Sequence, residues 1–209
     1  DSIEYLLIDD TEFDGNLNHF KGLSNLKEIE ILGINTREKI SDLSPIRNFT
    51  KLISLDVEHN AIEDLTPIIN LPNLEELMIN HNPIENLDLL LSINSLKFLD
   101  YIDLSDKLVS EILKKNDDCK IRFCNRDIGD CYTAFNLNDH SIKVTKYPIE
   151  DFTFNIVEIT FLDNSIIPLS DEEVHSELQE IGLFKDLNIA EYSSYEVHEN
   201  KMFLWFETH

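Results

Sequence analysis

Residues 49–68 read FTKLISLDVEHNAIEDLTPI, and residues 71–87 repeat the pattern as LPNLEELMINHNPIENL. Each apolar position of the first stretch recurs 22 residues later, and Asn60 recurs as Asn82. The shared pattern is L-x-x-L-x-x-L-x-L-x-x-N-x-I-x-x-L. A period of this length is typical of solenoids, in which one coil cannot bury its apolar face alone and successive coils stack.

The pattern resembles the leucine-rich repeat, and specifically the 22-residue units of bacterial internalin-like and SDS22-like proteins. The segments DLSPI at 42–46 and DLTPI at 64–68 strengthen the resemblance. It implies an α/β leucine-rich-repeat solenoid, a short curved parallel sheet of about five coils over residues 3–105. It also implies that Asn60 and Asn82 turn inward and bond backbone groups that would otherwise be buried without partners.

Alternating apolar residues predict where the strands lie. Leu55 and Val57 alternate, which predicts a short strand with both side chains inward. The same reasoning predicts the first, second and fifth strands, at Leu6 and Ile8, at Ile29 and Ile31, and at Ile102 and Leu104. In the second coil Ile34 takes the asparagine position, and extra residues around 36–39 predict an inserted loop.

The repeats are followed by a segment with helical periodicity. Residues 106–116 place Leu108, Ile112 and Leu113 on one face, which predicts a helix that covers the end of the solenoid. Residues 121–123 predict a last strand. The solenoid domain is therefore expected to occupy residues 1–124.

Residues 125–209 predict a small α+β domain whose family the sequence does not indicate. Segments rich in β-branched and aromatic residues predict strands at 132–137, 141–146, 152–162, 192–197 and 202–207. Ser170 and Glu173 form a capping-box pattern, which predicts a helix that ends near Gly182.

Acidic residues dominate the charge: 41 Asp and Glu stand against 17 Lys and Arg, for a net charge of -24. Such a surface repels nucleic acid and anionic lipid and attracts basic proteins. No apolar run approaches the ~18 residues that a membrane-spanning helix needs. We therefore expect a protein partner with a basic net charge, no nucleic acid and no membrane insertion.

The residues between the inward apolar ones are expected to face outward from the concave sheet. Seven of these fifteen are carboxylates and none is Lys or Arg; the fifteen are Tyr5, Leu7, Asp9, Glu28, Glu30, Leu32, Ser54, Asp56, Glu58, Glu76, Met78, Asn80, Tyr101, Asp103 and Ser105. The candidate partner-binding residues are Glu28, Glu30, Asp56, Glu58, Glu76, Met78, Tyr101 and Asp103. The carboxylates would attract a basic partner, while Met78 and Tyr101 would supply the apolar contacts common at interfaces.

Other reactive side chains give weaker signals. His59 and His81, one repeat apart, are expected to stack beside Glu58, and we expect no metal there and no cofactor. The spacing of Cys119, Cys124 and Cys131 fits no zinc pattern, so reduced thiols are expected, with one disulfide and a free thiol as the alternative.

Catalytic motifs are missing: there is no P-loop, no G-x-G-x-x-G, no H-E-x-x-H and no G-x-S-x-G. The sequence therefore favours a non-enzymatic, cytoplasmic interaction protein, with an immunity-type inhibitor of a basic partner as the sharpest hypothesis. One alternative is a secreted or surface internalin-like adhesin, with an export signal upstream of Asp1. Another is an enzyme in the C-terminal domain that uses Cys131, His140 or His175.

Overall fold

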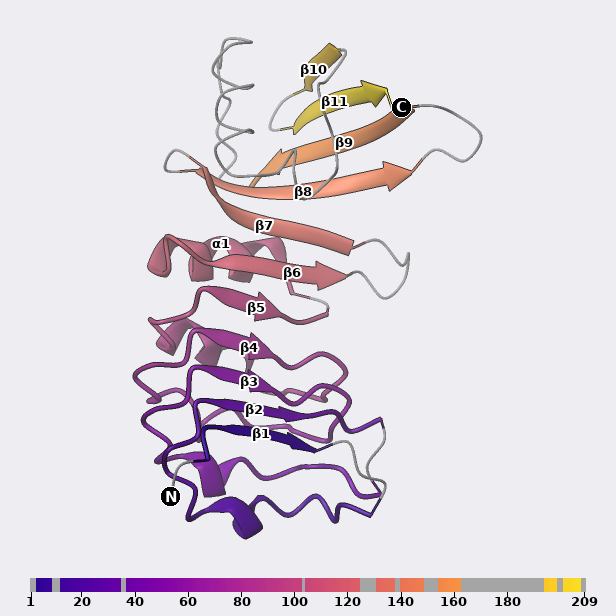
Figure 1. Cartoon of the computed structure of the whole chain (residues 1–209). Helices are drawn as coiled ribbons and strands as arrows, with labels where there is room; N and C mark the ends of the chain where they lie inside the picture. Colours follow the sequence, from indigo (N-terminus) through magenta and orange to yellow (C-terminus); the bar gives the residue numbers. More distant parts are fainter. Residues whose placement is uncertain are drawn as a thin grey trace.

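A computed structural model gives the fold and describes residues 3–8, 12–34, 37–102, 104–124, 131–137, 140–148, 154–162, 194–198 and 201–207. Within these ranges the strands form a single sheet, in which β1 to β6 are followed in space by β7 (Cys131–Leu137), β8 (His140–Pro148), β9 (Phe154–Phe161), β11 (Lys201–Glu207) and β10 (Ser194–His198) (Figure 1). The first six strands are parallel: β1 (Tyr5–Ile8), β2 (Glu28–Ile31), β3 (Ser54–Asp56), β4 (Glu76–Met78), β5 (Phe98–Asp100) and β6 (Lys120–Cys124).

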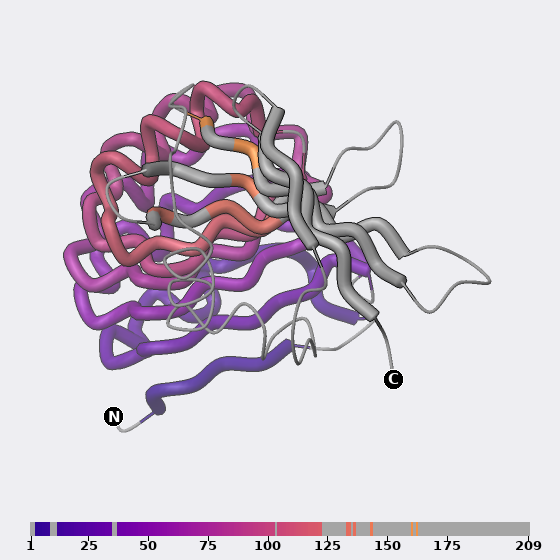
Figure 2. The backbone as a smooth tube through the Cα atoms, turned by 90° about the horizontal axis from the view of Figure 1, so that it is seen from above, coloured from indigo at the N-terminus to yellow at the C-terminus, as the bar shows by residue number. Residues whose placement is uncertain are grey.

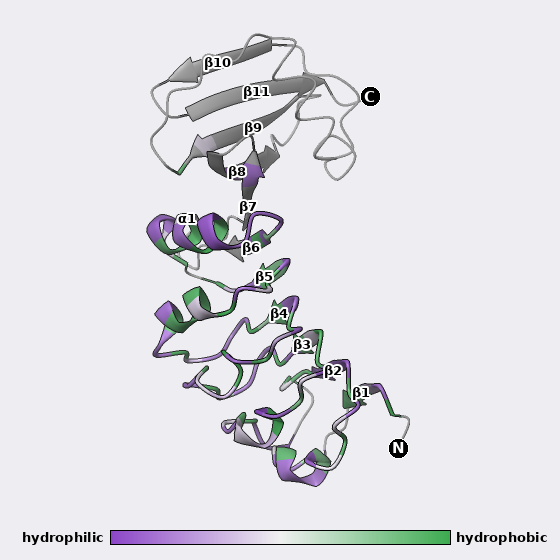
Figure 3. Ribbon diagram, turned by 90° about the vertical axis from the view of Figure 1, so that its left-hand side faces the viewer, coloured by the Kyte–Doolittle hydropathy of each residue, from purple (hydrophilic) through white to green (hydrophobic). Residues whose placement is uncertain are grey.

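The parallel strands belong to a solenoid, as the repeat predicts. Each strand lies on one side, and the chain returns on the other side through short 3-10 helices (Figure 3). These helices are η1 (Leu17–Phe20), η2 (Ser44–Ile46) and η3 (Leu87–Ser92). Seen from above, successive coils lie over one another (Figure 2). The core between the two sides holds the repeated leucines and isoleucines, with Leu55, Val57, Leu77 and Ile79 all fully buried.

The repeat asparagines bond the backbone of their neighbours, which confirms the implication of the resemblance. The Ile40 amide donates to Asn60 Oδ1 at 2.9 Å, and Asn60 Nδ2 donates to the carbonyls of Ile31 at 2.9 Å and Val57 at 3.0 Å. Asn82 repeats the arrangement one coil further on. Both side chains are buried, so they satisfy polar groups that water does not reach.

The fifth strand lies three residues earlier than the sequence analysis predicts. It is β5, in which Leu99 stands opposite Leu77, so the 22-residue spacing is kept. Tyr101 takes the inward position that Ile79 holds in the previous coil, and Leu104 takes the asparagine position and is buried. The prediction at Ile102 and Leu104 is wrong because it looked for an aliphatic pair and passed over a tyrosine in the core.

Helix α1 (Asp106–Lys115) confirms the predicted helix after the repeats. Ser105 caps its first turn, with its hydroxyl oxygen accepting from the Leu108 amide at 3.2 Å. Its buried face carries the predicted Leu108, Ile112 and Leu113 together with Val109. The helix packs against η3 on one side and against β7 and β8 on the other. It therefore joins the last coil to the strands that follow, instead of closing an open end.

The remaining strands are antiparallel and continue the same sheet: β7 (Cys131–Leu137), β8 (His140–Pro148), β9 (Phe154–Phe161), β10 (Ser194–His198) and β11 (Lys201–Glu207). β6 pairs with β7, with Ile121 opposite Ala134, so hydrogen bonding crosses the predicted boundary at residue 124. A separate α+β domain over 125–209 stays a prediction. The helix predicted from Ser170 to Gly182 lies outside the described residues.

Candidate functional site

The candidate binding surface is the outward side of β2, β3 and β4, here called the acidic face. Strand register aligns its side chains in rows: Glu28 stands beside Ser54 and then Glu76, and Glu30 stands beside Asp56 and then Met78. Glu58 follows Asp56 at the end of β3. Of the eight predicted residues, six therefore lie together on this face: Glu28, Glu30, Asp56, Glu58, Glu76 and Met78.

The other two predicted residues do not join the acidic face. Tyr101 is only 6% exposed, because it points into the core, and its hydroxyl donates to the Asn82 carbonyl at 3.4 Å. The prediction that Tyr101 faces a partner is therefore wrong, and it follows from the misplaced fifth strand. Asp103 lies outside the described residues.

Asp56 is the carboxylate of the acidic face whose pKa is raised. It is half-buried, Glu30 stands beside it on β2, and Glu58 lies two residues further along the chain. Burial is the main reason that the pKa of Asp56 rises to about 6, with Glu58, Glu30 and Asp100 adding repulsion in that order. The Glu58 amide, which donates to Asp56 Oδ1 at 3.2 Å, partly offsets the rise. A cation brought to this place would relieve a repulsion that the fold leaves in place.

Next to the acidic face, a polar chain crosses to β6. Asn80 Nδ2 donates to Glu58 Oε1 at 2.8 Å and to Asp100 Oδ1 at 2.6 Å. Buried Asp100 also forms an ion pair with Arg122, whose Nε donates to Asp100 Oδ2 at 2.6 Å and whose guanidinium lies 5.7 Å from the centre of the Phe98 ring. The hydrogen bond to Asp100 is the main reason that the pKa of Arg122 is raised.

Sequence reasoning missed Asp100 and Arg122, although a signal for them exists. Met78, Asp100 and Arg122 follow one another at the 22-residue period, so they occupy the same row. The misplaced fifth strand hid this row. As a result the face carries a negative part over β2–β4 and a partly exposed cation at β6, with Asp100 neutralised between them.

Apolar side chains border the acidic face on β1. Tyr5 and Leu7 alternate along this strand, Ile3 lies two residues before it, and all three are 49–51% exposed. The Tyr5 hydroxyl donates to Glu30 Oε2 at 2.9 Å, and this bond is the main reason that the pKa of Tyr5 is raised. Exposed apolar residues beside charged ones are typical of protein interfaces.

The two histidines stack as predicted, with ring centroids 4.0 Å apart and an interplanar angle of 16°. His59 and His81 both have a positive φ, 58° and 56°, so each sits in the left-handed turn that precedes a repeat asparagine. Burial, followed by the charge of His81, lowers the pKa of His59. Among the described residues, no group of three or more His, Cys, Asp or Glu side chains is placed to hold a metal ion.

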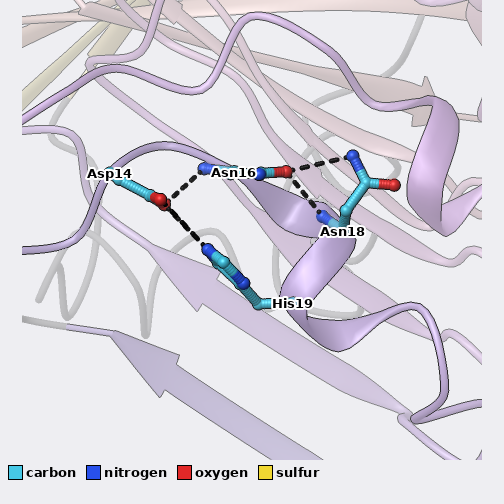
Figure 4. Close-up of polar contacts among 4 residues, drawn as sticks. All are labelled: Asp14, Asn16, Asn18 and His19. Carbon is cyan, nitrogen blue, oxygen red and sulfur yellow. Dashed lines mark hydrogen bonds and ion pairs between the residues drawn. The ribbon is translucent and has the colours of Figure 1, made fainter.

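A second polar cluster lies in the first coil and has a local explanation (Figure 4). Asn16 caps η1 by accepting from the Asn18 amide at 3.0 Å, and Asp14 accepts from the Asn16 amide at 3.0 Å. Asp14 also contacts His19 Nε2 at 3.0 Å, which is the main reason that the pKa of Asp14 is lowered. All four residues are exposed, and together they hold the turn before a short helix.

The residues proposed for an enzyme lie where the structure says nothing of their side chains. Cys131 and His140 are described only as backbone in β7 and β8, and His175 lies outside the described residues. Within the described residues no helix is both long and apolar enough to cross a membrane.

Comparisons with known proteins identify the repeat. Residues 50–92 match the family model for Leucine Rich repeats (2 copies). Two crystal structures from Listeria monocytogenes are similar: internalin C2, with 33% identity over 39% of this chain and a TM-score of 0.36, and an internalin (inlF), with 22% identity over 59% and a TM-score of 0.47. In each case the similarity covers 34% of the internalin chain. No curated protein matches the chain.

Proposed function

We propose that this chain, whose residues 50–92 match the family model for Leucine Rich repeats, is a non-enzymatic protein–protein interaction module whose partner is basic. Leucine-rich repeats present a regular sheet surface to protein partners, so the partner is sought first on the outward side of β2–β4. The finer part of the proposal concerns the charge of the partner and the residues that contact it.

One observation carries the proposal: carboxylates of neighbouring strands lie side by side, and the outward residues around them include no Lys or Arg. These nine outward residues, on β2–β4 or within two residues after each strand, are Glu28, Glu30, Leu32, Ser54, Asp56, Glu58, Glu76, Met78 and Asn80. Strands in a sheet stand about 4.8 Å apart, so Glu30 and Asp56 repel each other and disfavour the free fold. A Lys or Arg from a partner would remove that repulsion on binding.

The same charge pattern favours a particular kind of binding. An acidic surface accelerates encounter with a basic protein, and the acceleration falls as salt screens it. Met78 on the face and Tyr5 and Leu7 beside it offer apolar contacts that salt does not weaken. We propose that the protein acts as a cytosolic, immunity-type inhibitor that covers a basic partner, for which speed of association is an advantage.

The test compares two double variants of equal net charge. Glu28→Lys with Glu76→Lys reverses two exposed carboxylates on the acidic face, whereas Glu63→Lys with Glu85→Lys reverses two exposed carboxylates in the turns after the repeat asparagines. Each variant and the natural chain serve as bait in extracts of the native cell at about 50 and 500 mM salt, with mass spectrometry of the bound proteins. We expect a basic protein whose recovery falls at least about tenfold for the face variant only.

Two outcomes would overturn the proposal. If both variants lose the partner equally, overall charge and not the acidic face governs binding. If the partner is acidic, or is retained by the face variant and at high salt, then a different surface makes the contact.

A further inference from the structure

The junction between the parallel and antiparallel parts of the sheet brings two cysteines together. β6 and β7 lie side by side and run antiparallel (Figure 1), with Ile121 opposite Ala134, Arg122 opposite Thr133, and Phe123 opposite Tyr132. The register ends with Cys124 opposite Cys131. The sequence alone does not reveal this pairing, because the spacing of the cysteines fits a strand pair only once the register is known.

The backbone separation at such a position suits a disulfide. Residues directly opposite each other in antiparallel strands have Cα atoms about 4.5 or 5.5 Å apart, depending on whether the pair is hydrogen-bonded. Both separations fall in the range of about 4.4–6.8 Å that disulfides span. By the Cα criterion, the Cys124–Cys131 pair can therefore be bridged in this strand register.

The third cysteine, Cys119, belongs to the hydrophobic core. Cys119 is fully buried, and its thiol donates to the Lys120 carbonyl at 3.8 Å. Burial raises the pKa of Cys119 to about 12, so little of it is thiolate at neutral pH. Thiol–disulfide exchange proceeds through the thiolate, and Cys119 is therefore a poor competitor for either cysteine of the pair.

We propose that Cys124 and Cys131 form a redox site whose oxidised state is an intramolecular disulfide across β6 and β7. The oxidant is a small-molecule disulfide such as oxidised glutathione. One cysteine thiolate attacks it, forms a mixed disulfide and releases one glutathione thiolate. The second cysteine thiolate then attacks the protein sulfur of the mixed disulfide and releases the second glutathione. The protein loses two electrons and two protons, and the oxidant gains them as two thiols.

The disulfide would stabilise the junction between the parallel and antiparallel parts of the sheet. It would close the short connection from 124 to 131 at the point where the parallel coils meet the antiparallel strands. A loop of this length restricts the unfolded chain only moderately, so we expect the melting temperature to rise by about 5–10 °C. The site is independent of the acidic face, and its state in cells would report the redox compartment of the protein.

The test uses the full chain, reduced and then equilibrated with oxidised glutathione under native conditions. We expect a mass loss of two hydrogens, one remaining thiol by alkylation in denaturant, and a Cys124–Cys131 linked peptide by mass spectrometry. Cys119→Ala should oxidise in the same way and leave no thiol. Cys124→Ser and Cys131→Ser should instead stop at a glutathione adduct, because the resolving thiol is missing.

Each other outcome contradicts the site. A linked peptide that contains Cys119, a disulfide between two chains, or three thiols that persist in excess oxidant would each overturn the assignment. An unchanged melting temperature after the Cys124–Cys131 link has formed would show that the bond does not stabilise the junction between β6 and β7.

Discussion

On the inner side of the sheet, the repeat asparagines that follow β3 and β4 bond the backbone; on its outer side, carboxylates of β2 and β3 lie side by side. Asn60 and Asn82 each accept one backbone amide and donate to carbonyls of two coils. Four residues before Asn60, Asp56 lies beside Glu30, and burial together with its carboxylate neighbours raises its pKa to about 6.

The difference separates what specifies the fold from what is available for function. The inner side is determined by the need to bury leucines and satisfy the backbone, so its residues recur with the repeat. The outer side is free of that need, and a repulsion there survives because the core stabilises the coil more strongly than the face destabilises it. Variants on each side should therefore change stability in opposite directions.

The largest effect is expected on the inner side, for Asn82→Ala. The change leaves the Ile62 amide and the carbonyls of Val57 and Ile79 without their partner in a region that water does not reach. We expect the free energy of unfolding to fall by roughly 3–5 kcal/mol, measured by urea denaturation. The exposed Asn70→Ala is the control and should stay within about 0.5 kcal/mol. If both variants lose the same free energy of unfolding, the buried hydrogen bonds of Asn82 do not stabilise the fold.

The second effect concerns a close backbone approach in the second coil, at Gly33. A Cβ there would lie 2.1 Å from the His59 carbonyl oxygen and 2.8 Å from Asn60 Oδ1, whereas a Cβ at Gly22 would meet nothing within 4 Å. We expect Gly33→Ala to lower the free energy of unfolding by about 2–3 kcal/mol, and Gly22→Ala to change it by less than about 1 kcal/mol. Tolerance of Gly33→Ala would show that neighbouring coils can separate locally.

The inner side could be predicted from sequence because its constraint is periodic. Leu6 with Ile8 and Ile29 with Ile31 were found from spacing alone, and the register of β1 and β2 confirms them. The prediction fails at the fifth strand, where the core uses Tyr101 in place of an aliphatic residue. This error places Tyr101 on the wrong side and conceals Asp100 and Arg122, because a strand shifted by an odd number of residues exchanges its two sides.

The outer side and the junction resist sequence reasoning for a different reason. Which carboxylates crowd Asp56 depends on register between strands about 22 residues apart, and the repeat supplies that register only for regular coils. The pairing of Cys124 with Cys131 depends on the antiparallel register of β6 and β7, which the repeat does not predict. The repeat predicts the outward position of Glu28, Glu30 and Glu76; it predicts that Asp100 and Arg122 share a row only once the fifth strand is placed correctly.

A third effect tests why histidine stands in the turn between the two sides. His81 is exposed and has a φ of 56°, a region that β-branched residues disfavour strongly. We expect His81→Val to lower the free energy of unfolding by about 1–2 kcal/mol, and His81→Asn to leave it within about 0.5 kcal/mol, because asparagine tolerates this conformation. If His81→Asn is as harmful as His81→Val, the stack on His59 and not the backbone conformation is what the position requires.

The smallest effect has the opposite sign and lies on the outer side, at Asp56→Asn. Because folding raises the pKa of Asp56 to about 6, the folded state holds its proton more tightly than the unfolded state does, and stability is lost as pH rises from about 4 to about 6. Asparagine keeps the oxygen that accepts from the Glu58 amide and carries no charge. Urea denaturation should therefore find the variant more stable at pH 7.5, by about 1 kcal/mol once solvent screening of a half-exposed group is allowed for, and equal to the natural chain near pH 4.

Asp64→Asn is the matched control for this last variant. Asp64 is exposed and accepts from the Thr66 amide at 2.8 Å and from Asn86 Nδ2 at 2.6 Å, so bonding to Thr66 and then to Asn86 lowers its pKa. Its contribution is present above the ordinary aspartate pKa and is lost on acidification, so Asp64→Asn should not stabilise the protein at pH 7.5. A gain at Asp56 without a gain at Asp64 would show that the charged form of Asp56 destabilises the fold, mainly through its burial and further through its carboxylate neighbours. A partner cation beside Asp56 would then favour the carboxylate, and binding should strengthen as pH rises from 5 to 7.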